Sequence, residues 1–214
     1  MKARFRYRFY PTIQQQQSLA QLFGCVRVVW NDSLALCKQS EKKPSSAELQ
    51  KIVITHAKKT EERAWLSEVS NIPLQQSVAD LEIAFKNFFN SCKGKRKGRK
   101  VGYPKFKKRT NSQSARFRIG GFSLKDGGVY LAKIGIVNPI WSRPLPSEPS
   151  SVTVIKDCAN RYFFRVRASQ SCLTEAFENL YHIVIVHRSP FDFLSQATLE
   201  SCFLVDRIKG NPSY

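Results

Sequence analysis

Lysine and arginine are concentrated in residues 93–109, KGKRKGRKVGYPKFKKR, which contain ten of these residues and no acidic residue. Gly94, Gly98 and the turn Gly102-Tyr103-Pro104 disfavour a regular helix. A block this basic repels itself and stays extended unless an anion neutralises it. The stretch is therefore either a segment that lies along a phosphate backbone or a solvated linker.

Basic and apolar residues alternate along residues 2–10 and again along 114–119. A period of two predicts half-buried strands with one basic face. That face either contacts a nucleic-acid backbone or is merely solvated. Tyr103 and Phe106 are candidates for stacking on bases, whereas Trp30 is expected to pack in the core. The residues predicted to bind nucleic acid are Arg4, Arg6, Arg8, Lys95, Arg96, Lys97, Arg99, Lys100, Tyr103, Lys105, Lys107, Lys108, Arg109, Arg116 and Arg118.

The composition supports the same class of partner. The 214 residues allow one or two domains, and a hydrophobic content of 42% is enough for a buried core. A formal net charge of +19 favours a polyanion, with nucleic acid as the default. With no apolar run that could span a bilayer and no signal peptide, we expect a cytoplasmic protein, nucleoid-associated if it binds DNA. The oligomeric state stays open.

The six cysteines form no CxxC pair, and their spacing fits neither a zinc ribbon nor a disulfide framework. They are most simply small core hydrophobes. We expect no cofactor and assign no metal site.

The order of patterns predicts an α+β fold. A strand at 2–10 precedes a helix capped by Thr12, in which Gly24 suggests a close helix–helix approach. Two further helices are expected, one over 46–63 and one beginning at Ser70 or Asn71. Short strands follow, with a hairpin at 122–131 and a strand pair 151–155/161–166. We expect a small antiparallel β-barrel, closed by the first strand and interrupted by an inserted helical bundle. The expected divisions are 1–11 (first barrel strand), 12–92 (helical insertion), 93–168 (basic segment and remaining strands) and 169–214 (an irregular tail).

Several ordered landmarks resemble the N-terminal part of the OrfB/TnpB family, the RNA-guided nucleases of bacterial insertion sequences. They are FRYRFYPT (5–12), FGCVRVVWN (23–31), AWLSEVSNIPLQQSVADLEIAFKNFF (64–89), GYPKFKKR (102–109), RPLP (143–146) and RYFFRV (161–166). The resemblance covers roughly residues 1–167. It implies a wedge-like β-barrel split by a helical recognition insertion, followed by a RuvC-type nuclease domain with a zinc ribbon. It also implies guide RNA and DNA as partners.

The chain departs from the family pattern where the nuclease domain should start. It reads IVIVHRSPFDFL (183–194) in place of an Ile-Asp-Leu-Gly type signature. The net charge also changes, from 32 Lys/Arg and 11 Asp/Glu over residues 1–170 to 3 and 5 over 171–214. These observations suggest an out-of-frame tail and a chain truncated before the nuclease. The acids Asp192, Glu200 and Asp206 are expected to be solvated, so we assign no catalytic residue and expect no enzyme activity from this chain alone.

Three functional hypotheses remain. The chain is a transposon-associated, TnpB-like protein that binds guide RNA and/or DNA through its basic surface. Alternatively, it is a nuclease-dead RNA-guided DNA-binding repressor, or a non-functional decayed transposase fragment.

Overall fold

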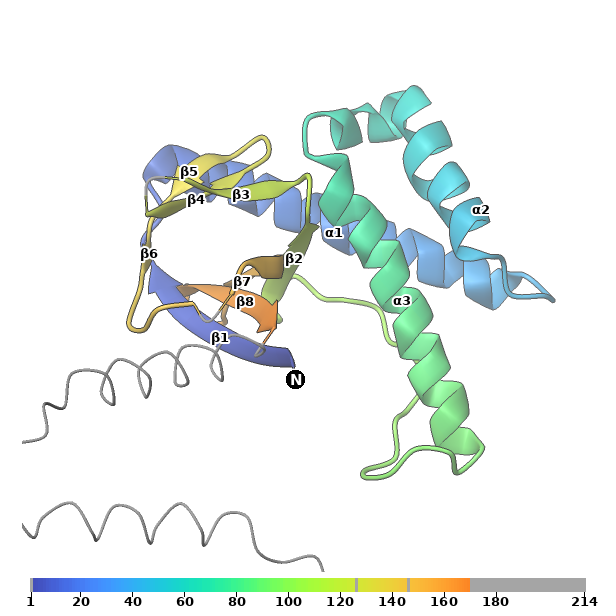
Figure 1. Ribbon diagram of the computed structural model, residues 1–214. Coiled ribbons are helices and arrows are strands. Elements are labelled where there is room, and N and C mark those ends of the chain that lie inside the picture. The colour runs from blue at the N-terminus through green and yellow to red at the C-terminus, as the bar shows by residue number, and fades with distance from the viewer. Residues whose placement is uncertain (1, 126, 146, 170–214) are drawn as a thin grey trace, which may run out of the picture. The chain divides into compact units, whose positions relative to one another are not determined.

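A computed structural model describes residues 2–125, 127–145 and 147–169 (Figure 1). Every described helix and strand lies within residues 2–169. The predictions for the tail, including the out-of-frame reading, lie outside the described residues.

The described strands form two antiparallel sheets. The five-stranded sheet has the order β2-β7-β8-β1-β6, and the three-stranded sheet has the order β3-β4-β5. With the helices, this confirms an α+β fold. No pairing among the described residues joins the edge strands β2 and β6, so the closed barrel is not confirmed. The strands are β1 Lys2–Phe9, β2 Gln113–Arg118, β3 Phe122–Lys125, β4 Gly128–Leu131, β5 Gly135–Val137, β6 Pro139–Ile140, β7 Pro149–Lys156 and β8 Tyr162–Ser169.

Both predicted strand pairs are present. In the β3–β4 hairpin, Phe122 lies opposite Leu131. In the β7–β8 pair, Val152 faces Val166. The turn between β7 and β8 places Asn160 at a φ of 58°, a left-handed conformation that asparagine tolerates better than most residues. Short strand-like runs separated by turn residues were sufficient to predict both pairs.

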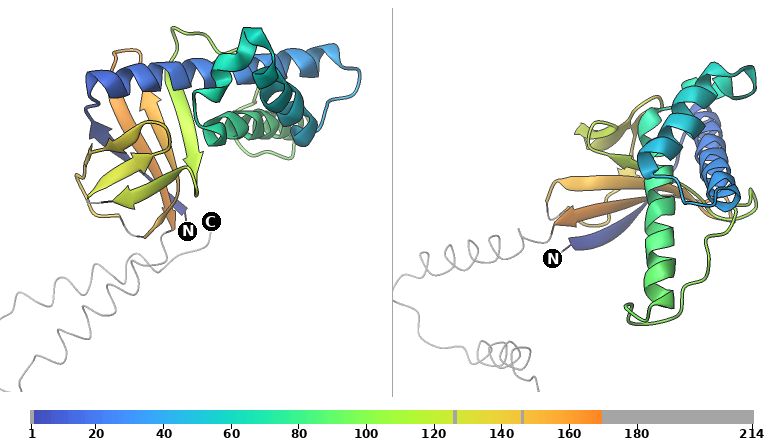
Figure 2. Two further views of the ribbon diagram at one scale, coloured as in Figure 1. Left: turned by 90° about the horizontal axis from the view of Figure 1, so that it is seen from above. Right: turned by 90° about the vertical axis from the view of Figure 1, so that its right-hand side faces the viewer.

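Two long helices follow the predicted pattern. Helix α1 (Ile13–Gln39) begins with a capping box, in which Thr12 and Gln15 each accept a hydrogen bond from the other's backbone N–H. Helix α3 (Asn71–Cys92) has Ser70 at its N-cap position. Its apolar stripe is buried, and α3 packs against both α1 and β2. In the left view of Figure 2, α1 extends from the sheets to the other helices.

The single helix predicted over 46–63 was wrong. Helix α2 (Ser46–Gln50) begins after the capping residue Ser45 but gives way to a π-helical segment at Lys51–His56. Two 3₁₀ segments follow, Ala57–Lys59 and Glu61–Ser67. The run Ile52-Val53-Ile54-Thr55 is entirely β-branched, which lowers α-helix propensity through crowding at χ1. Thr60, in an extended conformation, then ends the first 3₁₀ segment.

One hydrophobic core joins the sheets to the helices. Tyr7, Phe9, Phe117 and Phe164 point into it from the five-stranded sheet, and Trp30 enters it from α1. Within the described residues, no helix is long and apolar enough to cross a membrane. The side chains that alternate with these core residues along each strand point to the opposite face of the five-stranded sheet.

Candidate nucleic-acid interface

The outer face of the five-stranded sheet is rich in arginine. In the pairing of β1 with β8, Arg4 lies opposite Arg167 and Arg6 lies opposite Arg165. Like charges directly opposite each other on one sheet face destabilise the sheet. The opposed arginines therefore lower the stability of the sheet, and a bound anion would relieve their repulsion.

The register continues these two rows across the sheet. Arg165 pairs with Thr153, which pairs with Arg116, and Arg167 pairs with Ser151, which pairs with Arg118. The side chains alternating with them, such as Phe117 and Phe164, are buried. We call the outward set the arginine face. It consists of Arg4, Arg6, Arg8, Arg116, Arg118, Arg165 and Arg167.

Arg165 and Arg167 were missed in the sequence, although the signal was present. Both alternate with buried Phe164, Val166 and Ala168, just as the arginines of β1 alternate with its core residues. The pairing of β8 with β1 could not be predicted from local patterns, because the two strands are more than 150 residues apart along the chain.

An aromatic side chain supports part of the arginine face. The guanidinium carbon of Arg6 lies 3.6 Å from the ring centroid of Phe163, and that of Arg8 lies 5.1 Å from the same ring. Cation–π contact orients these groups without neutralising them. The Nε of Arg8 is buried and has no hydrogen-bond partner among the described residues.

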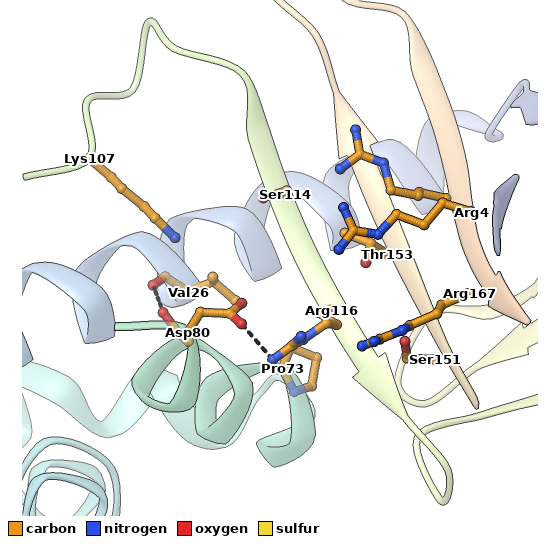
Figure 3. A pocket seen from close by; sticks show the side chains of 12 residues that line it. Arg4, Val26, Pro73, Asp80, Lys107, Ser114, Arg116, Ser151, Thr153 and Arg167 are labelled. Atoms are coloured by element: carbon orange, nitrogen blue, oxygen red, sulfur yellow. Dashed lines mark hydrogen bonds and ion pairs between the residues drawn. The ribbon is translucent and has the colours of Figure 1, made fainter. Parts of the chain in front are cut away.

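A groove of about 240 Å³ separates the arginine face from α1 and α3. We call it the arginine groove. Figure 3 shows its side chains converging from the strands on one side and the helices on the other. Its charged lining residues are Arg4, Asp80, Lys107, Arg116, Arg165 and Arg167.

Among the described residues, Asp80 is the single acid in the lining of the arginine groove, and it is paired. An oxygen of its carboxylate lies 2.5 Å from a terminal nitrogen of Arg116. Burial raises the pKa of Asp80, although Arg116 and Lys107 act in the opposite direction. The groove thus remains strongly cationic, with one of its arginines held by this internal carboxylate.

The first half of the basic segment is open to solvent. Residues 93–100 are all exposed, so Lys95, Arg96, Lys97, Arg99 and Lys100 form a cationic loop after α3. Gly94 and Gly98 adopt positive φ angles of 68° and 99°, which glycine accepts without strain.

The second half of the basic segment is pinned to α1. The side-chain amide of Asn31 accepts a hydrogen bond from Lys107 N at 2.8 Å and donates one to Lys107 O at 3.1 Å. The indole N–H of Trp30 donates to Lys105 O at 3.1 Å. Trp30 is 8% exposed, which confirms its core role. Residues 105–107 are therefore held against α1 through their backbone and are not a free linker.

The pinned backbone sends its side chains in different directions. Lys107 enters the arginine groove, with its ammonium 4.0 Å from the ring centroid of Trp30, and burial lowers the pKa of Lys107. Lys105, Lys108 and Arg109 are exposed. The Tyr103 ring packs edge-on against Phe85 and Phe88 and is 40% exposed.

Phe106 is 47% exposed, and the ammonium of Lys38 lies 4.5 Å from its ring centroid. Of the two aromatic stacking candidates, Phe106 is the more exposed, although the Lys38 ammonium lies near its ring.

Among the described residues, no group of three or more His, Cys, Asp or Glu side chains could hold a metal ion. Cys25 and Cys37 are buried as expected, and burial raises the pKa of Cys25 to about 11. Cys92 and Cys158 are exposed, so the expectation of core cysteines was wrong for these two. The tail acids Asp192, Glu200 and Asp206 lie outside the described residues.

Comparison with known proteins identifies relatives over most of the chain. A family model named for OrfB of IS605 and described as a helix-turn-helix domain matches residues 1–43. In the structure this region contains strand β1 and helix α1.

Three curated proteins are similar to this chain. A "Putative RNA-guided DNA endonuclease" of Streptomyces pristinaespiralis is 41% identical over 170 residues, which are 76% of this chain and 40% of the relative. The "Putative RNA-guided DNA endonuclease InsQ" of Escherichia coli K12 is 28% identical over 164 residues, 74% of this chain and 38% of the relative. The "Virulence protein VsdF" of Salmonella dublin is 35% identical over 91 residues, 38% of this chain and 76% of the relative.

The chain spans about 40% of the length of the two endonuclease-named relatives. The ordered landmarks, the matched N-terminal model and these relatives agree with one another. The chain belongs to the OrfB/TnpB family of insertion-sequence proteins.

Proposed function

We propose that this chain binds nucleic acid through its phosphates, using the arginine face, the arginine groove and the basic segment 93–109. The observation that carries this proposal is the direct opposition of Arg4 to Arg167 and of Arg6 to Arg165. Among the described residues, Arg116 is the one member of the arginine face with an ion-pair partner. Phosphates would supply the missing counter-charges.

The two types of cation would contribute differently. Guanidinium groups bind phosphate oxygens with two parallel hydrogen bonds, and the sheet holds them at fixed positions. The lysines of 95–100 sit on an exposed loop and would act as point charges. Because phosphate contacts position a protein without reading sequence, we expect binding with little sequence preference.

The partner class follows from the family. Two relatives are named RNA-guided DNA endonucleases, which supports DNA and a guide-type RNA as the bound polyanions. We also keep as a proposal that the two sheets form a wedge-like barrel, since residues of both sheets share one core.

We propose binding without cleavage. Metal-dependent phosphodiester hydrolysis relies on carboxylates that hold divalent cations, and we assign none in this chain. Incubation with guide-type RNA, target DNA and Mg²⁺ should leave the DNA intact, and specific cutting would contradict this part of the proposal.

A binding assay tests the main claim. Replacing Arg4, Arg165 and Arg167 together by serine should weaken binding of fluorescent single-stranded RNA and duplex DNA by about tenfold or more at moderate salt. The matched control replaces Lys42, Lys51 and Lys59, three exposed lysines of the helical region, by serine. This change removes the same amount of charge. Equal losses in both triple variants, or no loss in the first, would refute the assignment. Circular dichroism melting checks that each variant is folded.

A further inference from the structure

A second cavity, of about 480 Å³, lies on a different side of α1 from the arginine groove. Helix α1 contributes Ala20, Phe23, Gly24 and Arg27 to its lining, whereas Val26 lines the arginine groove. The rest of the lining comes from residues 109–111 and 113, from the end of β7 and from the turn between β7 and β8. We call this cavity the Gly24 pocket.

Gly24 has no packing reason to be glycine. It lies in the middle of the 27-residue helix α1, where glycine is less favourable than alanine. A Cβ atom at this position would meet no neighbouring atom within 4 Å. The close helix–helix approach suggested by the sequence is therefore absent. The effect of the missing side chain is to leave space in the pocket.

The Gly24 pocket is cationic. Arg27, Arg109 and Lys156 line it from three different segments. Asp157, the one acid among the described lining residues, accepts hydrogen bonds from Arg161 N at 2.9 Å, Arg161 Nε at 2.7 Å and Ala159 N at 3.0 Å. Because that carboxylate is already engaged within its own turn, the three cations have no ion-pair partner among the described residues of the lining.

The pocket and the groove are joined by the chain itself. Lys107 and Ser114 line the arginine groove, and the residues between them, 109–111 and 113, line the Gly24 pocket. A nucleic-acid strand lying in the arginine groove would therefore pass close to the Gly24 pocket. The cavity volume falls in the range of about 300 to 1,000 Å³ that suits small ligands.

We propose that the Gly24 pocket holds one nucleotide of a bound strand. Arg27, Arg109 and Lys156 bind its phosphate, and the rest of the nucleotide occupies the space over Gly24. This inference rests on the proposed nucleic-acid binding, because the nucleotide belongs to the strand that the arginine groove holds.

Substitution of Gly24 separates pocket occupancy from folding. Gly24→Ala should raise the melting temperature, since alanine favours helix and no atom opposes its Cβ. Gly24→Leu should fold as well but fill the pocket, and should weaken single-stranded RNA binding about fivefold or more. Gln17→Leu, at an exposed position of α1, places the same side chain outside the pocket and should bind like wild type. A Gly24→Leu variant that binds RNA as tightly as Gln17→Leu overturns the inference.

Titration with mononucleotides tests the ligand. Adenosine 5′-monophosphate should shift the backbone NMR signals of Asn111 and Gln113 in wild type and in the Arg4/Arg165/Arg167 triple serine variant, but not in Gly24→Leu. Adenosine should give no shifts, because the phosphate anchors the ligand. Equal shifts with inorganic phosphate alone overturn the nucleotide assignment. Strand binding that is lost in the triple variant but unchanged in Gly24→Leu leaves the proposed function intact while the inference fails.

Discussion

Arg6 of β1 lies directly opposite Arg165 of β8 on the exposed face of the five-stranded sheet. The guanidinium of Arg6 is held against Phe163, so it remains in the row. The neighbouring pair, Arg4 and Arg167, repeats the arrangement. Two adjacent like-charged pairs oppose sheet formation. Removing one of these arginines should therefore change both the stability of the protein and its affinity for nucleic acid.

Arg165→Thr should stabilise the protein and weaken its binding of nucleic acid. Removing one member of a like-charged pair relieves repulsion of about 0.2–1 kcal/mol, and threonine suits a strand. Urea unfolding should show the gain, and fluorescence anisotropy should show the loss of affinity. Lys59→Thr, at an exposed site off the sheet, should change neither by much. A destabilised Arg165→Thr would show that the two arginines do not repel each other.

Asp80→Asn should tighten nucleic-acid binding severalfold. The substitution frees Arg116 and removes the one acid from the lining of the arginine groove. Stability should change by no more than about 1 kcal/mol, because both partners are partly exposed and burial of the carboxylate offsets the ion pair. The control is Asp32→Asn, which breaks the Asp32–Arg63 pair with the same change in charge. Equal tightening by both variants would mean that net charge alone is responsible.

Asn31→Ala should release residues 105–108 from α1. The change leaves the N–H and C=O of Lys107 without their partner, at a cost of about 1–3 kcal/mol. Trypsin should then cleave after Lys105, Lys107 or Lys108 faster than in wild type. Ser40→Ala, which removes a hydroxyl bond at the exposed end of α1, serves as a control for general loosening. Unchanged cleavage in Asn31→Ala would contradict the pinned conformation.

The β7–β8 turn should lose stability in acid through Asp157. Desolvation raises the pKa of this carboxyl, but the bonds from Arg161 and Ala159 outweigh it, so the pKa is lowered overall from 3.8. A lowered folded-state pKa adds stability above the unfolded value, and that stability is lost as the pH falls through the folded value. Wild type should therefore be more stable than Asp157→Asn above pH 3.8, with the difference vanishing at lower pH. A constant difference across this range would contradict the assignment.

Local patterns predicted much of the fold. The Thr12 cap, the apolar stripe of α3 and the β7–β8 pair could all be predicted because each depends on residues close in sequence. The prediction of one helix over 46–63 was wrong because the β-branched run disfavours a continuous α-helix after the Ser45 cap. The prediction of a closed barrel was not confirmed. Closure depends on pairing between edge strands that are far apart in the sequence, and no local pattern contains that information.

The candidate site was harder to predict than the elements. Arg4, Arg6 and Arg8 could be recognised by alternation alone, but the rows they form with Arg165 and Arg167 depend on the register between β1 and β8. The Asp80–Arg116 pair joins a helix to a strand, and no local pattern contains it. The basic segment was found by composition, while its attachment to Asn31 required tertiary structure.

The most direct test is the salt dependence of binding. For single-stranded RNA, the logarithm of the association constant should fall linearly with the logarithm of the salt concentration. The triple replacement of Arg4, Arg165 and Arg167 by serine should reduce that slope by about 2, since each lost phosphate contact contributes about 0.7. The Lys42/Lys51/Lys59 triple variant should keep the wild-type slope. Equal slopes for wild type and the arginine variant, or affinity that barely changes with salt, would contradict phosphate binding by the arginine face.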